Sequence, residues 1–160
     1  MQKILQGAVA AMKFGQSTHL RLILKAGFSY FAIVFAAGFG LGIGRVLWAV
    51  PRFGPRTAEL MEMPLMLVAI VLAAFWVCRR FAVPPRIWPR LGTGLVALGL
   101  SLLAEVSVVL QLRGLSVAEY WASRDPVSGT VYIAMLGVFA AMPWLITSSR
   151  SELNSESNSP

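Results

Sequence analysis

The chain has 160 residues, of which 57% are hydrophobic and only 13% are charged. A soluble domain carries about 25% charged residues, so this composition excludes an ordinary water-soluble globule and indicates a protein solvated by lipid. The net charge of +7 does not indicate a nucleic-acid partner, because the basic residues flank apolar stretches and form no basic face with interleaved aromatics.

The N-terminal segment, residues 1–25, is predicted to lie in the cytoplasm. Its four basic residues are spread among apolar ones, namely Lys3, Lys13, Arg21 and Lys25. That pattern is typical of a helix lying in the membrane surface. The segment is too irregular for a cleaved signal peptide, and Met12 is an alternative start.

Four apolar stretches are each long enough to cross a hydrocarbon core of ~30 Å as a helix. They are residues 26–48, 59–78, 91–112 and 129–147. Irregular backbone is too costly in lipid, so all four are predicted helices. We therefore predict an all-α fold: an antiparallel four-helix transmembrane bundle over residues 26–147.

Prolines and polar residues mark the connections between the spans. Pro51 and Pro55 frame the first, and Pro84 and Pro85 lie in the second, because proline stops a helix. The third connection, residues 113–128, has capping-box spacing that predicts a short helix over residues 117–123. The tail, residues 148–160, is rich in Ser, Asn and Glu and is predicted to be disordered.

The basic residues also predict the orientation. Nine Lys and Arg residues belong to the N-terminal segment, the second connection and the tail, and five belong to the other side. Positive residues favour the cytoplasmic side. We therefore expect a multi-pass protein of the bacterial inner membrane with both termini in the cytoplasm.

Small residues four apart predict where the helices pack, because helices in lipid associate by close contact of small side chains. The predicted packing residues are Gly38, Gly40, Gly42, Gly44, Gly137 and Ala141. The glycines of the first span would suit packing within the bundle or a homodimer equally well.

Ionisable residues inside the spans are costly and are therefore candidates for function. Positions along the spans place five polar groups together in the outer half of the bundle: Arg45, Glu59, Glu62, Glu105 and Tyr132. The simplest interpretation is a buried salt bridge between Arg45 and Glu62, shared with Glu105. The alternative starts from the excess of carboxylates over arginine, which would let Glu105 relay a proton or bind a cation.

The stretch from Gly38 to Arg80 resembles a group of small bacterial four-helix inner-membrane proteins with no known activity. The residues that carry the resemblance are Arg45-Val46-Leu47-Trp48, Pro51-Arg52, Gly54, Ala58-Glu59-Leu60, Glu62, Pro64, Met66-Leu67, Trp76 and Arg79-Arg80. The resemblance implies a location and a fold, and no activity.

These observations predict a non-catalytic accessory or interaction subunit, with the lipid bilayer and a second copy or another membrane subunit as partners. No cofactor, metal or catalytic residue is predicted. A proton- or cation-linked transporter or channel component is the first alternative. A small membrane enzyme that uses the carboxylates is the second.

Overall fold

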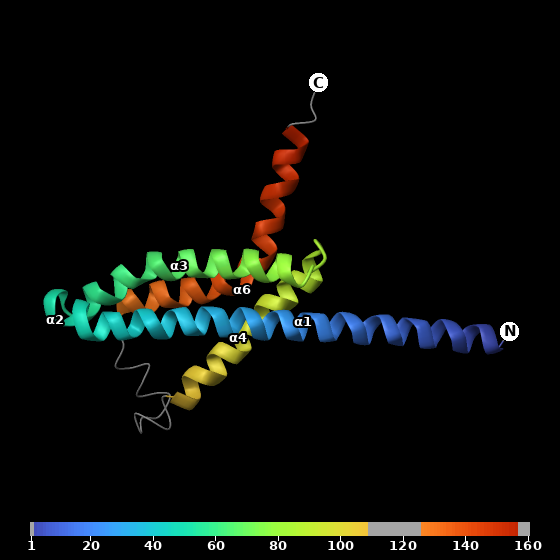
Figure 1. The fold of residues 1–160 in the computed structure, drawn as a ribbon, viewed down its shortest axis with the longest axis horizontal. Helices are drawn as coiled ribbons and strands as arrows, with labels where there is room; N and C mark the ends of the chain where they lie inside the picture. The colour runs from blue at the N-terminus through green and yellow to red at the C-terminus, as the bar shows by residue number, and fades with distance from the viewer. Residues whose placement is uncertain (1, 109–125, 157–160) are drawn as a thin grey trace.

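The computed structural model describes residues 2–108 and 126–156, and within them it is helical apart from short connections (Figure 1). The elements are α1 (Gln2–Gly44), the π-helical turn η1 (Arg45–Ala49), α2 (Val50–Phe53), α3 (Pro55–Arg80), α4 (Ile87–Val108) and α6 (Pro126–Glu156). Four helical segments are long and apolar enough to cross a membrane: His19–Phe53, Pro55–Arg80, Ile87–Ser107 and Gly129–Ile146. The prediction of an all-helical, multi-pass protein is confirmed at this level.

The four long helices form a closed ring of contacts. Helix α1 packs on α3 and α4, and α6 packs on the same two helices from the other side. Helices α1 and α3 and the first part of α6 lie along a common direction, whereas α4 crosses them obliquely and the last part of α6 turns away (Figure 1). The chain is therefore a bundle in which three helices run together and the fourth is tilted against them.

The first connection is much shorter than the prolines predict. Helix α2 continues to Phe53, and α3 begins at Pro55. The reversal is made by Gly54, whose φ of +77° is a conformation that only glycine adopts without strain. Pro55 follows at the first helical position, where its fixed φ is suited to a helix and its missing N–H costs nothing.

Two helices extend further than the sequence analysis expects. Helix α1 is unbroken from Gln2 to Gly44, so there is no break at residue 25 between a surface segment and the first span. Helix α6 continues to Glu156, so most of the tail predicted to be disordered is helical. Extending an existing helix is far easier than starting one, which composition alone does not capture. The short helix predicted over residues 117–123 and the end of the third span lie outside the described residues.

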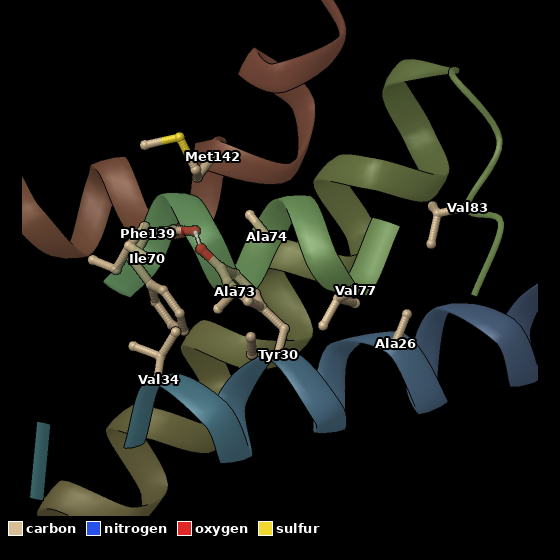
Figure 2. Packing of buried hydrophobic residues seen from close by; sticks show 11 residues of the cluster. Ala26, Tyr30, Val34, Ile70, Ala73, Ala74, Val77, Val83, Phe139 and Met142 are labelled. Carbon is tan, nitrogen blue, oxygen red and sulfur yellow. Dashed lines mark hydrogen bonds between the residues drawn. The ribbon is translucent and has the colours of Figure 1, made fainter. Parts of the chain in front are cut away.

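The hydrophobic core lies in the half of the bundle next to the connection between α3 and α4. Its members are Ala26, Tyr30 and Val34 of α1; Ile70, Ala73, Ala74 and Val77 of α3; Val83 of the connection; Ala97 of α4; and Phe139 and Met142 of α6 (Figure 2). Most are small or β-branched, so the helices approach closely there. In the opposite half, no residue of α1 after Val34 is buried, and the next buried residue along the chain is Ala49 of η1.

Pro143 removes one backbone hydrogen bond from α6 within this core. It lies inside α6 and has no N–H, so the carbonyl of Phe139, four residues earlier, loses its helical partner. The hydroxyl of Tyr30, which is completely buried, donates to that carbonyl at 3.1 Å (Figure 2). The ring of Tyr30 also lies against that of Phe139, with centroids 4.7 Å apart. A side chain from α1 thus replaces the bond that proline removes from α6.

The carbonyl of Pro143 itself binds two further groups. It accepts a hydrogen bond from Arg90 Nη1 at 3.2 Å and a weak one from the buried thiol of Cys78 at 3.9 Å. The Arg90 guanidinium also donates to the carbonyls of Pro84 and Val83, at 3.3 and 3.4 Å. One side chain at the start of α4 therefore ties the α3–α4 connection to α6.

Replacing Tyr30 by Phe should destabilise the protein by about 1–3 kcal/mol, because the Phe139 carbonyl would be left buried without a donor. In a Pro143→Ala background the new Ala N–H can bind that carbonyl, so the same replacement should cost much less. Unfolding of the four variants in detergent, followed by circular dichroism, measures the coupling. An equal cost in both backgrounds would show that Tyr30 does not compensate for the proline.

Two glycines allow very close contacts between helices in the half of the bundle that holds the core. A Cβ on Gly94 of α4 would lie 1.8 Å from the carbonyl oxygen of Ala140 in α6. A Cβ on Gly27 of α1 would lie 2.7 Å from the side chain of Val96 in α4. Both distances are shorter than atoms tolerate, so α4 packs against its two neighbours only because these positions are glycine.

Most of the glycines predicted to pack the helices do not contact another helix of the described chain. A Cβ on Gly38 would make an ordinary contact with Met66, at 3.4 Å. For the remaining predicted glycines no described atom lies within 4 Å of that position: Gly40, Gly42, Gly44 and Gly137. Ala141 is half-buried. Spacing identifies small residues that share a face, but it does not say whether another helix of the same chain covers that face.

We expect Gly94→Ala to destabilise the bundle by about 1–3 kcal/mol, as overpacking of a close contact does. Gly99→Ala is the matched control, because Gly99 is on the same helix and its Cβ position is open. That change should be neutral or should stabilise by about 0.5–1 kcal/mol, through the lower backbone entropy of alanine. Thermal unfolding in detergent compares the two, and similar melting temperatures would contradict the packing described here.

Candidate functional site

Three of the five predicted polar residues form one ion-pair cluster at the hairpin between η1 and α3. Arg45 Nε lies 3.1 Å from Glu62 Oε2, and Arg45 Nη1 lies 3.9 Å from Glu59 Oε1. The cluster is half-buried, with side-chain exposures of 33% for Arg45, 21% for Glu59 and 16% for Glu62. We call these three residues the Arg45 cluster.

The hairpin brings the cluster together. The tight reversal at Gly54 returns the chain so that the first turns of α3 lie beside η1. Glu59 and Glu62 are three residues apart and therefore share a helix face. Arg45 opens the π-helical turn, in which the N–H of Val50 donates to the carbonyl of Arg45 five residues before it. Single π turns within α-helices often occur at functional sites.

The Arg45 cluster is held mainly by charge. The Nε atom of Arg45 is buried and close to Glu62, but its N–H is not directed well enough to form a hydrogen bond. One cation faces two carboxylates, so the cluster has one negative charge in excess when all three groups are ionised. It fixes α1 and α3 relative to each other at an end of the bundle where the described part of α1 has few buried side chains.

The other two predicted residues form a pair of their own. The hydroxyl of Tyr132 in α6 donates a hydrogen bond to the carboxylate of Glu105 in α4. The expected sharing of Arg45 between Glu62 and Glu105 is not what the structure has, because the second carboxylate beside Arg45 is Glu59. The early start of α3 at Pro55 puts Glu59 inside the helix, one turn before Glu62 and beside Arg45.

The described residues contain no group of side chains arranged to bind a metal ion. In residues 2–108 and 126–156 no three His, Cys, Asp or Glu side chains lie close enough to hold an ion. The Arg45 cluster and the Glu105–Tyr132 pair each supply polar oxygen atoms, and both are engaged with protein partners. What they can do chemically is to neutralise charge between helices or to exchange a proton.

A second feature is a stripe of small residues that runs along α1. Four of them are spaced by four and all are exposed: Ala32, Ala36, Gly40 and Gly44. Residues four apart lie on one face of a helix, so these four form a continuous face that no helix of the described chain covers. We call them the outward stripe. Gly38 and Gly42 lie on the opposite side of α1, are half-buried, and Gly38 faces Met66 of α3.

Part of this arrangement was not predicted from the sequence. The spacing of four that joins Gly40 to Gly44 continues backwards to Ala36 and Ala32. Tyr30 and Arg90, which satisfy carbonyls of α6, were not among the predicted residues. The available signal for Tyr30 was an interior proline in one span, which requires a donor from another.

No protein-family model, no curated protein and no solved structure matches this chain. The fold defines its class, a multi-pass all-helical protein with four helices suited to a membrane. Beyond that class, the functional argument depends on the geometry of the Arg45 cluster, the Glu105–Tyr132 pair and the outward stripe.

Replacing Arg45 by Gln should destabilise the fold by about 1–3 kcal/mol, because two half-buried carboxylates lose their cation. The matched control is Arg52→Gln, which removes the same charge from an exposed side chain in the same hairpin, and should cost no more than about 0.5 kcal/mol. A Glu62→Gln change should reduce the cost of Arg45→Gln, since less charge would remain unpaired. Thermal unfolding of these variants in detergent measures the effects, and equal losses for Arg45 and Arg52 would contradict a stabilising cluster.

Proposed function

We propose that this protein is a non-catalytic interaction subunit of the bacterial inner membrane, with both termini in the cytoplasm. Its outward stripe on α1 docks a transmembrane helix of another chain, and a second copy of this protein is the occupant. The observation that carries the proposal is the exposure of four small residues at a spacing of four along one helix face. The orientation rests on the bias of Lys and Arg towards the side of the termini.

The physics of helix association in lipid supports this role. Lipid tails are as apolar as leucine, so two helices associate only where close packing gives more contact than lipid does. A Cβ on Gly40 or Gly44 would meet no described atom within 4 Å. Glycine destabilises a helix by roughly 0.5–1 kcal/mol relative to alanine, and contact with lipid does not offset this loss. Close packing of a second helix against the glycines would offset it.

A second copy fits the stripe because the stripe is complementary to itself. In a parallel pair related by a two-fold axis, Gly40 and Gly44 of one protomer lie opposite the same residues of its partner. Small residues at such a spacing allow the two backbones to approach at a right-handed crossing. The Arg45 cluster begins one residue after the stripe, and in this proposal its role is structural: it holds α1 against α3 so that the stripe keeps facing outward.

Cysteine crosslinking in membranes tests the interface. In a Cys78→Ala background, which removes the only native cysteine, Gly40→Cys and Gly44→Cys should each give an oxidised product of twice the mass of the chain. The matched control is Gly99→Cys on α4. Gly99 is also an exposed glycine with an open Cβ position, but Leu95 and Leu103 flank it at a spacing of four. It should give little product.

The outcomes separate the alternatives. A product of another mass would identify a different membrane subunit as the occupant. Absence of any product at Gly40 and Gly44, or equal product at Gly99, would contradict the proposed interface. A Gly40→Ile variant should lower the amount of Gly44→Cys product severalfold while the monomer keeps its folded yield, because no described atom of the chain lies near that position.

A proton- or cation-linked role is the second candidate, and the observation that favours it is the Tyr132 hydroxyl bound to the Glu105 carboxylate between α4 and α6. Buried carboxyl groups with such a partner are typical of proton paths in membrane proteins. Under the interaction-subunit proposal, Glu105→Gln should leave proton flux into reconstituted vesicles unchanged. Lost flux at full folded yield would instead favour transport. Tyr132→Phe is the companion variant and should follow Glu105→Gln in either case.

A further inference from the structure

A groove lies on the outside of α1 at the end of the bundle next to the α3–α4 connection, one helical turn before Ala32 and at the far end of α1 from the Arg45 cluster. Its volume is about 460 Å³, and it is lined by Leu24, Lys25, Phe28 and Ser29 of α1 and by Phe81. Phe81 is the first residue after α3. The groove therefore lies between the beginning of the first span and the connection from α3 to α4.

The lining combines an apolar wall with one positive end. Leu24 and Phe28 are 48% and 60% exposed, so their side chains face the surroundings of the bundle. Lys25 and Ser29 are four residues apart and share a helix face. An ammonium group and a hydroxyl group therefore belong to the same face of α1.

Nothing negative in the described chain balances Lys25. It forms no ion pair with any described residue. Between residues 19 and 92 the acidic residues are Glu59 and Glu62, and both are engaged with Arg45 at the other end of α3. Further exposed cations belong to this end of the bundle: Arg79 and Arg80, at the end of α3, and Arg86, just before α4. Residues 19–92 therefore contribute only cations to this end of the bundle, whereas α6 carries Glu152 and Glu156 in its C-terminal part.

We propose that the groove binds an anionic glycerophospholipid. The phosphate group accepts hydrogen bonds from the Lys25 ammonium and the Ser29 hydroxyl, and an acyl chain lies against Leu24, Phe28 and Phe81. Basic pockets beside transmembrane helices on the cytoplasmic side bind anionic headgroups in this way. A lipid is the source of the phosphate because nearly all of the lining surface is apolar, and a free phosphate ion would leave that surface uncovered.

Native mass spectrometry of the intact chain with an equimolar mixture of phosphatidylglycerol and phosphatidylcholine tests the site. The wild-type protein should retain phosphatidylglycerol in preference, and Lys25→Gln should lower that preference about fivefold, the effect of one cation near a membrane surface. The matched control is Arg52→Gln, which removes one exposed cation at the other end of the bundle and should leave the preference unchanged. Lys25→Arg should keep it.

A second variant keeps the test decisive if Lys25→Gln folds poorly. Phe81→Ala should reduce retention of both lipids while leaving their ratio unchanged, because it removes acyl contact and no charge. Equal retention of the two lipids by the wild-type protein would overturn the proposal. So would equal losses for Lys25→Gln and Arg52→Gln, which indicate general attraction to positive charge. Full displacement of the lipid by inorganic phosphate would show that the acyl contact plays no part.

Discussion

The constraint on which this structure depends is that lipid offers no hydrogen bonds, so every backbone polar group in the membrane must find its partner inside the protein. Helices meet this requirement along most of their length, and a proline inside a helix breaks it. At Pro143 the chain meets it with side chains from elsewhere. Tyr30 of α1 binds the carbonyl that lost its partner, and Arg90 of α4 binds the carbonyl of the proline itself. The break in α6 thereby becomes the point at which α1, α4 and α6 are joined.

This junction also explains why the two halves of the bundle differ. Around Pro143, buried residues and the glycine contacts at Gly27 and Gly94 hold the helices close. Sharp bends in helices occur almost always at proline or a similar interruption, and the C-terminal part of α6 turns away from the bundle (Figure 1). Towards the other end, the described part of α1 is mostly exposed and the Arg45 cluster provides the main fixed contact with α3. The bundle is thus tightly packed around Pro143, and the outward stripe extends into the half where α1 is mostly exposed.

Much of the fold could be predicted because a lipid environment leaves few choices. Apolar length determined the four spans, and the predicted ranges fall within or close to the observed ones. The predictions were wrong where the local backbone conformation, and not the apolar length, determines the structure. Composition indicated a break at residue 25 and a disordered tail, whereas both neighbouring helices simply continue. The prolines indicated a connection framed by Pro51 and Pro55, but a single glycine with positive φ, Gly54, makes the turn.

The candidate site was predictable in its members and less so in its arrangement. Helical depth alone gathered the five polar residues, and it could not decide which carboxylate Arg45 would meet, because that depends on where α3 begins and on the π turn. Small-residue spacing gave two pairs of glycines four residues apart, Gly38 with Gly42 and Gly40 with Gly44. The two pairs lie on opposite faces of α1, because residues two apart are about 200° apart around a helix. Which face is covered depends on the tilt of the neighbouring helices, which no local pattern encodes.

The π turn between Gly44 and Val50 has a consequence for the direction of the hairpin. Its N–H groups reach back five residues instead of four, so it holds one residue more than the same length of α-helix. Each residue after it takes the place that the preceding residue would have in an uninterrupted α-helix, a rotation of about 100°. If residues 45–49 became regular α-helix with no residue lost, the hairpin would turn and Glu59 and Glu62 would move away from Arg45. Deleting one of residues 46–49 together with the π turn would instead leave the hairpin in place.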